Sequence, residues 1–223
     1  MSMTKLTASD GHSFGAYTAG ANHLTVGLVV VQEIFGVNPH MRHASDVLAA
    51  AGFKVICPAV FDRAERDVEL GYTGEDMQKG VALRGKIKDA DTLLDLEAAA
   101  TALGTPRVGI IGYCWGGTLA WLGATRSTKF HAASGWYGGG IAAAKTETPH
   151  CPVQLHFGAK DDHIPLTDVE AIRQAQPGVE VFVYDAGHGF GCEERGSFDQ
   201  ASYDQAQARS LAFFRKHLGS TAN

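Results

Sequence analysis

The sequence has no paired cysteines, no long apolar run and no block of basic charge. Its four cysteines, Cys57, Cys114, Cys151 and Cys192, stand far apart without a CxxC pair, which fits neither a zinc cluster nor a disulfide framework. Apolar runs fall short of the ~20 residues of a membrane span, and the N-terminus lacks the apolar core of a signal peptide. We therefore expect a cytoplasmic protein whose single thiols serve either packing or chemistry.

Net charge and chain length limit the expected binding partners and the number of domains. The net charge is -5 and the Lys and Arg residues are scattered, so we expect no nucleic-acid partner and no membrane partner. A chain of 223 residues with 45% hydrophobic content is long enough for one large core and too short for two comfortable catalytic domains. Residues 1–223 are expected to form a single domain, without internal repeats, that acts as a monomer on a small molecule.

Strand and helix patterns alternate along the chain after an N-terminal hairpin at 4–18. The expected strands lie at 24–31, 53–58, 107–111, 131–137, 152–157 and through Val179, Val181 and Val183. Five helices are expected. The first begins at Asn38-Pro39, the second carries Leu83, Ile87, Ala90 and Leu94 on one stripe, and the third follows residue 117. The fourth begins with a capping box at 167–170, and the last carries Ala208, Leu211, Phe214 and Leu218 on its core face. Residues 59–79 are polar and without a clear period, which favours a long active-site loop, with a short helix within it as the alternative. This alternation predicts an α/β domain with a mostly parallel sheet, helices on both faces, and a site at the carboxyl ends of the strands.

The hexapeptide GYCWGG at 112–117 joins a buried strand to a helix. Such a turn is typical of a nucleophile elbow, in which glycines let the chains pass closely and the nucleophile occupies a strained backbone position. The amide of Trp115, at the positive end of the helix, would stabilise a Cys114 thiolate and later an oxyanion. The alternative is a glycine-rich turn that holds a buried cysteine.

A nucleophilic cysteine needs a base, and the base needs an orienting acid. Asp161 follows the expected strand at 152–157, and His188 follows the strand that ends near Tyr184. The chain order Cys114, Asp161, His188 is the order of α/β-hydrolases. Taken singly, His188 could be a surface residue and Asp161 a turn residue; together with the elbow they favour a catalytic triad.

Glu33 also follows a buried strand. A carboxylate there is costly unless it is paired or hydrogen-bonded. Its loop is also where the second oxyanion donor of this fold arises. The alternative is that Glu33 caps a helix or pairs with an arginine.

With these motifs the chain resembles the dienelactone hydrolase (carboxymethylenebutenolidase) family over roughly residues 24–218. The segments that carry the resemblance are QEIFGVN at 32–38, GYCWGG at 112–117, GWYG at 135–138, DDHIP at 161–165 and GHGF at 187–190. The resemblance implies an α/β-hydrolase fold and an ester or lactone hydrolase that needs no metal or cofactor. It also implies a Cys114-His188-Asp161 triad with oxyanion donors from the amides of Ile34 and Trp115. In the family, the glutamate that matches Glu33 contacts the resting thiol and helps to deprotonate it when substrate displaces the carboxylate.

One position departs from the family pattern. Dienelactone hydrolases hold the substrate carboxylate with arginines, one of them four residues after the histidine, and that position is Cys192 here. Arg195, Arg63 and Arg66 are the candidates to replace it. The hypothesis is an ester or lactone hydrolase of this family, dienelactone-like, whose substrate need not be a dienelactone. Trp136 and Tyr137 either flank the pocket and favour a flat or apolar acyl group or are packing residues.

Two other classes of protein compete with this interpretation. Amidotransferases of flavodoxin-like fold and their deglycase relatives also place a cysteine on an elbow near a glutamate, but they lack the late histidine loop with a preceding aspartate motif. A thiol redox sensor or binding module would use Cys114 alone and would need neither His188 nor Asp161 at strand ends. Peroxide sensitivity without esterase turnover would favour that second class.

Overall fold

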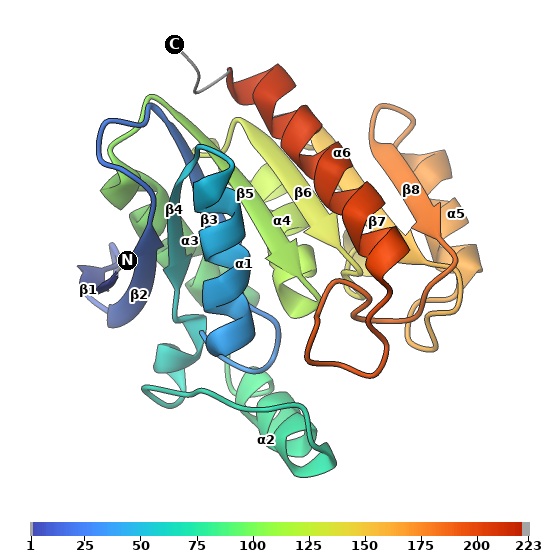
Figure 1. Ribbon diagram of the computed structural model, residues 1–223, viewed down its shortest axis with the longest axis horizontal. Helices are drawn as coiled ribbons and strands as arrows, with labels where there is room; N and C mark the ends of the chain where they lie inside the picture. The colour runs from blue at the N-terminus through green and yellow to red at the C-terminus, as the bar shows by residue number, and fades with distance from the viewer. Residues whose placement is uncertain (1, 220–223) are drawn as a thin grey trace.

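One eight-stranded sheet runs through the computed structural model, which describes residues 2–219 (Figure 1). Its strands are β1 (Ser2–Thr7), β2 (Ser13–Ala19), β3 (Val26–Val31), β4 (Lys54–Pro58), β5 (Arg107–Tyr113), β6 (Ala132–Trp136), β7 (Val153–Gly158) and β8 (Glu180–Tyr184). They lie in the order β1-β2-β4-β3-β5-β6-β7-β8. β1 and β2 form the expected antiparallel hairpin, and every pair from β4 to β8 is parallel. The predicted fold class, a mostly parallel sheet of the α/β-hydrolase type, is confirmed.

Helices cover both faces of the sheet (Figure 1). They are α1 (Pro39–Ala50), α2 (Gly74–Arg84), α3 (Asp89–Leu103), α4 (Trp115–Arg126), α5 (Leu166–Ala175) and α6 (Gln200–Leu218). α1 and α6 lie on one face, whereas α3, α4 and α5 lie on the other. β3, β5, β6 and β7 are buried on both faces, as their continuous apolar runs indicate; only Arg107 at the start of β5 is exposed.

The prediction of one helix with Leu83, Ile87, Ala90 and Leu94 on a single stripe is wrong. The chain forms α2 and α3 instead, with a break between Gly85 and Lys88. Leu83 and Ile87 are buried on either side of the break, while Ala90 is exposed. The side chain of Arg84 stabilises the break by donating a hydrogen bond to the carbonyl of Ile87 at 2.9 Å. Apolar spacing alone cannot distinguish one helix from two that share a buried side.

Two helix details also differ from expectation. α5 begins at Leu166 after Pro165, and no side chain caps it, so the predicted capping box at 167–170 is not formed. α1 does begin as predicted, because the Asn38 side chain accepts a hydrogen bond from the amide of Met41 at 3.1 Å. In α6 the exposed Ala208 lies outside the buried face, which is formed by Ser202, Ala206, Ser210, Phe213, Phe214 and Leu218.

α2 occupies the second half of the segment that was expected to be a loop. The Thr73 side chain caps it in a reciprocal box with Asp76, which explains why a polar segment folds into a helix. α2 lies beyond the carboxyl ends of the strands (Figure 1). It packs closely there, because a Cβ atom at Gly80 would lie 2.1 Å from the carbonyl oxygen of Ile34.

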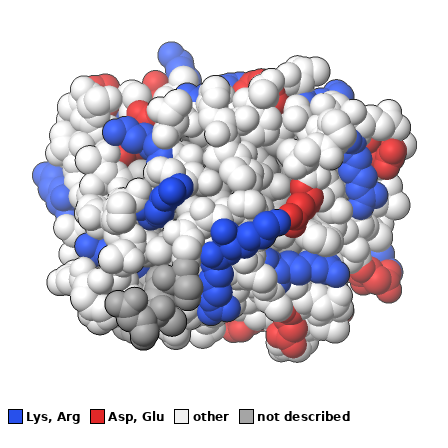
Figure 2. All heavy atoms as spheres, turned by 90° about the horizontal axis from the view of Figure 1, so that it is seen from above, with Lys and Arg blue, Asp and Glu red and all other residues white. Residues whose placement is uncertain are grey.

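Basic and acidic side chains are interspersed on the face that Figure 2 shows, with wide uncharged areas between them. This distribution lacks the continuous basic stripe that tracks a phosphate backbone on that face. None of the helices in residues 2–219 combines the length and the apolar character needed to cross a membrane.

Candidate active site

The backbone at Cys114 is strained in the way an elbow requires. Its φ of 54° lies in the left-handed region, and Cys114 is the N-cap of α4. A Cβ atom at Gly112 would lie 1.9 Å from the carbonyl oxygen of Gly116, and one at Gly116 would lie 2.2 Å from that of Val31. Both positions therefore require glycine for α4 to approach the sheet so closely.

Cys114, His188 and Asp161 come together although they lie in three separate loops. His188 Nε2 lies 3.2 Å from Cys114 Sγ, and His188 Nδ1 lies 2.8 Å from Asp161 Oδ2. The other oxygen of Asp161 accepts hydrogen bonds from the amides of His163 at 2.8 Å and Ile164 at 3.1 Å. The turn before α5 thus holds the carboxylate, and the carboxylate orients the imidazole.

These contacts shift the pKa values of both His188 and Asp161. Burial alone would lower the pKa of His188, but hydrogen bonds to Asp161 and Cys114 and their negative charges raise it to about 10. Burial would raise the pKa of Asp161, yet the bond and charge of His188 and the two backbone amides lower it. The arrangement favours the protonated imidazole beside an ionised Asp161.

The amides of Trp115 and Ile34 lie on the two loops expected to supply oxyanion donors. The amide of Trp115 is the first of α4, and the first amides of a helix have no acceptor within it. Ile34 directly follows Glu33 at the end of β3, and both Ile34 and Trp115 line the cavity beside Cys114. The indole of Trp115 is fixed by donating to Asp89 at 3.3 Å.

Glu33 is fully buried and is paired with an arginine, as the alternative interpretation held. Arg195 Nη1 donates to one carboxylate oxygen at 3.3 Å, and the Tyr72 hydroxyl donates to the other at 3.4 Å. Burial raises the pKa of Glu33, and the charges of Arg195 and His188 only partly offset that effect. The carboxyl group is therefore poised to take up a proton more readily than an exposed glutamate.

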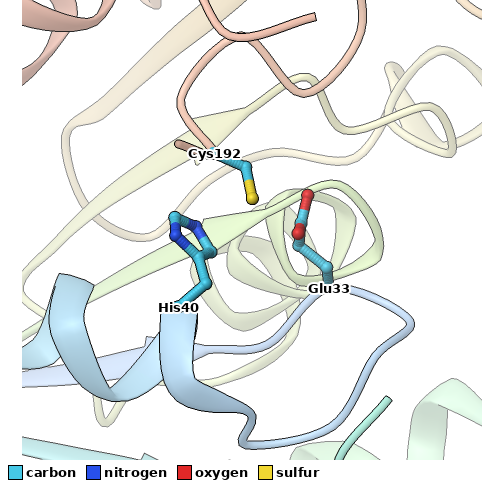
Figure 3. Close-up of side chains that lie close together, drawn as sticks. All are labelled: Glu33, His40 and Cys192. Atoms are coloured by element: carbon cyan, nitrogen blue, oxygen red, sulfur yellow. The ribbon is translucent and has the colours of Figure 1, made fainter. Parts of the chain in front are cut away.

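Figure 3 shows a buried cluster in which His40 and Cys192 approach Glu33; the possible ligand atoms of the three lie within 4.8 Å of one another. Burial lowers the pKa of His40 to about 4 and raises that of Cys192 to about 12, so both are neutral at pH 7. These are ligands that suit a soft divalent metal. However, the guanidinium of Arg195 already places a positive charge on Glu33, which opposes a second cation there.

The other residues expected to bind substrate lie elsewhere. Trp136 and Tyr137 are fully buried and do not line the cavity; the Trp136 indole donates to Ser210 at 3.2 Å in the core. Of the three candidate arginines only Arg195 lines the cavity. Arg63 pairs with Asp95 and Asp10, and Arg66 donates to the carbonyl of Ser13.

A cavity of about 600 Å³ opens beside Cys114. Its walls come from the loop after β3, from α2, from α4 and from the residues that follow β6. The sequence interpretation missed the α2 wall, which contributes Met77 and Val81, and the contact of Tyr72 with Glu33. The only available signal was the unusual length of the polar segment 59–79, which indicated a functional role without identifying its residues.

The comparisons with known proteins agree with this geometry. Residues 14–218 match the Dienelactone hydrolase family. A protein of Synechocystis sp. named "Putative carboxymethylenebutenolidase" is 34% identical over 212 residues, covering 86% of each chain. Carboxymethylenebutenolidase 1 of Cupriavidus pinatubonensis is 30% identical over 220 residues, covering 93% of each. The crystal structure of a "Putative Dienelactone Hydrolase" from Klebsiella pneumoniae superposes with a TM-score of 0.80 at 30% identity, covering 97% of this chain and all of that one.

The family match extends over the β3 loop, the elbow, the aspartate loop and the histidine loop, which are the segments that line or orient the cavity. The relatives cover nearly the same length as this chain. The chain therefore belongs to the dienelactone hydrolase family and is an ester or lactone hydrolase.

Proposed function

We propose that the protein hydrolyses a carboxylic ester or lactone through a Cys114-His188-Asp161 triad and a thioester intermediate. The observation that carries this proposal is the pair of contacts from His188, 3.2 Å to Cys114 Sγ and 2.8 Å to Asp161 Oδ2. A base that touches both nucleophile and acid can remove the thiol proton and keep its own orientation.

In the proposed cycle, the Cys114 thiolate attacks the carbonyl carbon and forms a C–S bond while the carbonyl oxygen becomes an oxyanion. The amides of Ile34 and Trp115 stabilise that charge. Collapse breaks the C–O bond, and the leaving alkoxide takes the proton from His188 Nε2. His188 then removes a proton from water, whose oxygen attacks the thioester, and the thiolate departs with its electron pair.

Glu33 is proposed to control the charge state of the thiol. Its burial and raised pKa suit a group that accepts a proton when its surroundings change. Its bond to Arg195 supplies a means of control, because a substrate group that engages the guanidinium competes with the carboxylate. We expect Glu33→Gln to slow acylation more than deacylation, since deacylation starts from a thioester without a free thiol.

The first test is hydrolysis of p-nitrophenyl acetate by the wild type and by Cys114→Ala, with mass spectrometry of the trapped acyl-enzyme. We expect turnover and a single adduct at Cys114 in the wild type and neither in the variant. Cys151→Ala, at a half-buried cysteine away from the cavity, is the matched control and should behave as the wild type. Full activity in Cys114→Ala would refute the proposal, and a folded, reduced but inactive wild type would favour the thiol-sensor alternative.

A further inference from the structure

The lining of the cavity beside Cys114 extends along α4. Cys114, Thr118, Leu122 and Arg126 all line it, and they stand at successive intervals of four residues on one side of that helix. Twelve residues of helix extend about 18 Å at 1.5 Å per residue. We call this extension, from Cys114 to Arg126, the α4 groove.

The two sides of the α4 groove are apolar or small. α2 contributes Met77 and Val81, one helical turn apart, and Val81 is 57% exposed although it is a large apolar residue. The segment after β6 contributes Gly139, Gly140 and Ala143. Val81 thus presents apolar surface that no other part of the described chain covers.

The charges in the α4 groove are already paired with one another. Arg84 lies 2.7 Å from Asp89, and Arg126 donates to Glu147 at 2.9 Å. Each arginine therefore already has a carboxylate partner, so a second carboxylate in the groove would gain less from it.

The dimensions fit a chain-like group. A volume of about 600 Å³ distributed over ~18 Å gives a mean cross-section of about 33 Å², enough for an alkyl chain or a phenyl ring. An extended chain advances by about 1.2 Å per bond, so the groove accommodates on the order of ten bonds or more.

We propose that the α4 groove binds an elongated, uncharged apolar group of the ester that Cys114 cleaves. This inference rests on the proposed hydrolase function and adds the class of substrate. It separates the protein from an enzyme adapted to a compact, carboxylated lactone, because the lining continues from Cys114 along α4 as far as Arg126.

The test uses two ester series, p-nitrophenyl esters with acyl chains from two to twelve carbons and acetates of alcohols with the same range. We expect kcat/KM to rise by about two- to fourfold per added CH₂ in one series, through several carbons, as apolar surface is buried. If the acyl series is the responsive one, a p-nitrophenyl monoester of a dicarboxylic acid should react at least tenfold more slowly than the uncharged ester of equal length. If the alcohol series responds, the matching probe is the acetate of an ω-hydroxycarboxylic acid, which carries the carboxylate at the end of the alcohol chain.

Ala143→Trp introduces a large side chain into the lining of the α4 groove from an exposed position, so the fold should tolerate it. It should remove the chain-length dependence, so that kcat/KM for long and short esters becomes alike within the responsive series. Ala82→Trp is the matched control, because Ala82 is exposed on α2 but does not line the cavity. Its chain-length profile should equal that of the wild type.

Three results would overturn the inference: equal kcat/KM for all lengths in both series, an unchanged profile in Ala143→Trp, or a preference for the carboxylate-ended esters. Each of these leaves turnover of p-nitrophenyl acetate intact, so the hydrolase proposal would survive. Loss of acetate turnover in the wild type would instead refute the proposed function itself.

Discussion

Replacing Asp161 by asparagine tests the orientation and charge of the catalytic base. The amide oxygen of asparagine can still accept from the backbone amides of His163 and Ile164, so the loop should keep its shape. Its NH₂ group would face His188 Nδ1, which then must accept a hydrogen bond and place its own proton on Nε2, toward Cys114. In that tautomer the imidazole cannot remove the thiol proton.

The size of the effect follows from the raised pKa of His188. Its rise from 6.5 to about 10 corresponds to about 5 kcal/mol at ~1.4 kcal/mol per unit of pKa. Asp161 and Cys114 share this stabilisation of the imidazolium, so an equal share for Asp161 is about 2.5 kcal/mol, or roughly 70-fold. The wrong tautomer adds to this loss, and the same change in a serine triad costs about 10⁴ in kcat. We therefore expect kcat/KM to fall by a factor on the order of 10² to 10⁴.

The assay is kcat/KM for p-nitrophenyl acetate from pH 5 to 10.5, corrected for hydrolysis by hydroxide. Wild-type activity should decline as the pH rises through about 10, where His188 loses its proton, and in Asp161→Asn this alkaline limb should move to lower pH. Asp162→Asn, at the exposed neighbouring position, should match the wild type. The reasoning is refuted if kcat/KM of Asp161→Asn stays within threefold of the wild-type value and its alkaline limb does not move.

The raised pKa of His188 also makes the free energy of unfolding depend on pH. Because the folded-state pKa of His188 lies above its ordinary value, its contribution to the free energy of unfolding is complete below pH 6.5 and is lost as the pH rises through about 10. Urea unfolding at pH 6.5 and pH 10 should show a loss of a few kcal/mol in the wild type. Asp161→Asn should lose clearly less, and equal losses in both proteins would contradict the assignment.

Two further substitutions test the packing around the site. Arg195→Gln leaves the Glu33 carboxylate buried without its cation and should lower the free energy of unfolding by about 3 kcal/mol at pH 8. The loss should be smaller at pH 5, because the raised pKa of Glu33 increases the fraction of the neutral carboxyl as the pH falls. Chemical denaturation at both pH values measures this, and a loss that does not depend on pH would contradict it. Gly116→Ala should destabilise by more than about 3 kcal/mol, since its Cβ would lie 2.2 Å from the Val31 carbonyl oxygen. Gly178→Ala, which meets nothing within 4 Å, should melt like the wild type, and similar melting temperatures for both alanine variants would exclude the proposed clash.

Features specified by neighbouring residues could be predicted from the sequence. The run before Gly112, the elbow glycines and Cys114 are adjacent, so the strand, the turn and the helix follow from one short segment. The positions of Asp161 and His188 after strands could be predicted because parallel strands bring their carboxyl ends to one edge.

Features that depend on distant contacts could not be predicted in this way. Arg195 and Glu33 are 162 residues apart, and their pairing depends on how the histidine loop packs against the β3 loop. Tyr72 reaches Glu33 from a polar segment without periodicity, so no local pattern identified it. The residues Trp136 and Tyr137 have the same aromatic character in a core as in a pocket, and only the fold separates the two locations.

The contact between Gly80 and the carbonyl of Ile34 joins two parts of the enzyme mechanically. α2, whose Met77 and Val81 line the cavity, packs directly on the peptide group between Ile34 and Phe35. The amide of Ile34, a proposed oxyanion donor, is adjacent to that peptide group. A ligand wide enough to push α2 outward would release that peptide from its support. Oversized substrates would then lose oxyanion stabilisation in the transition state, so the upper size limit of the enzyme would appear as a fall in kcat.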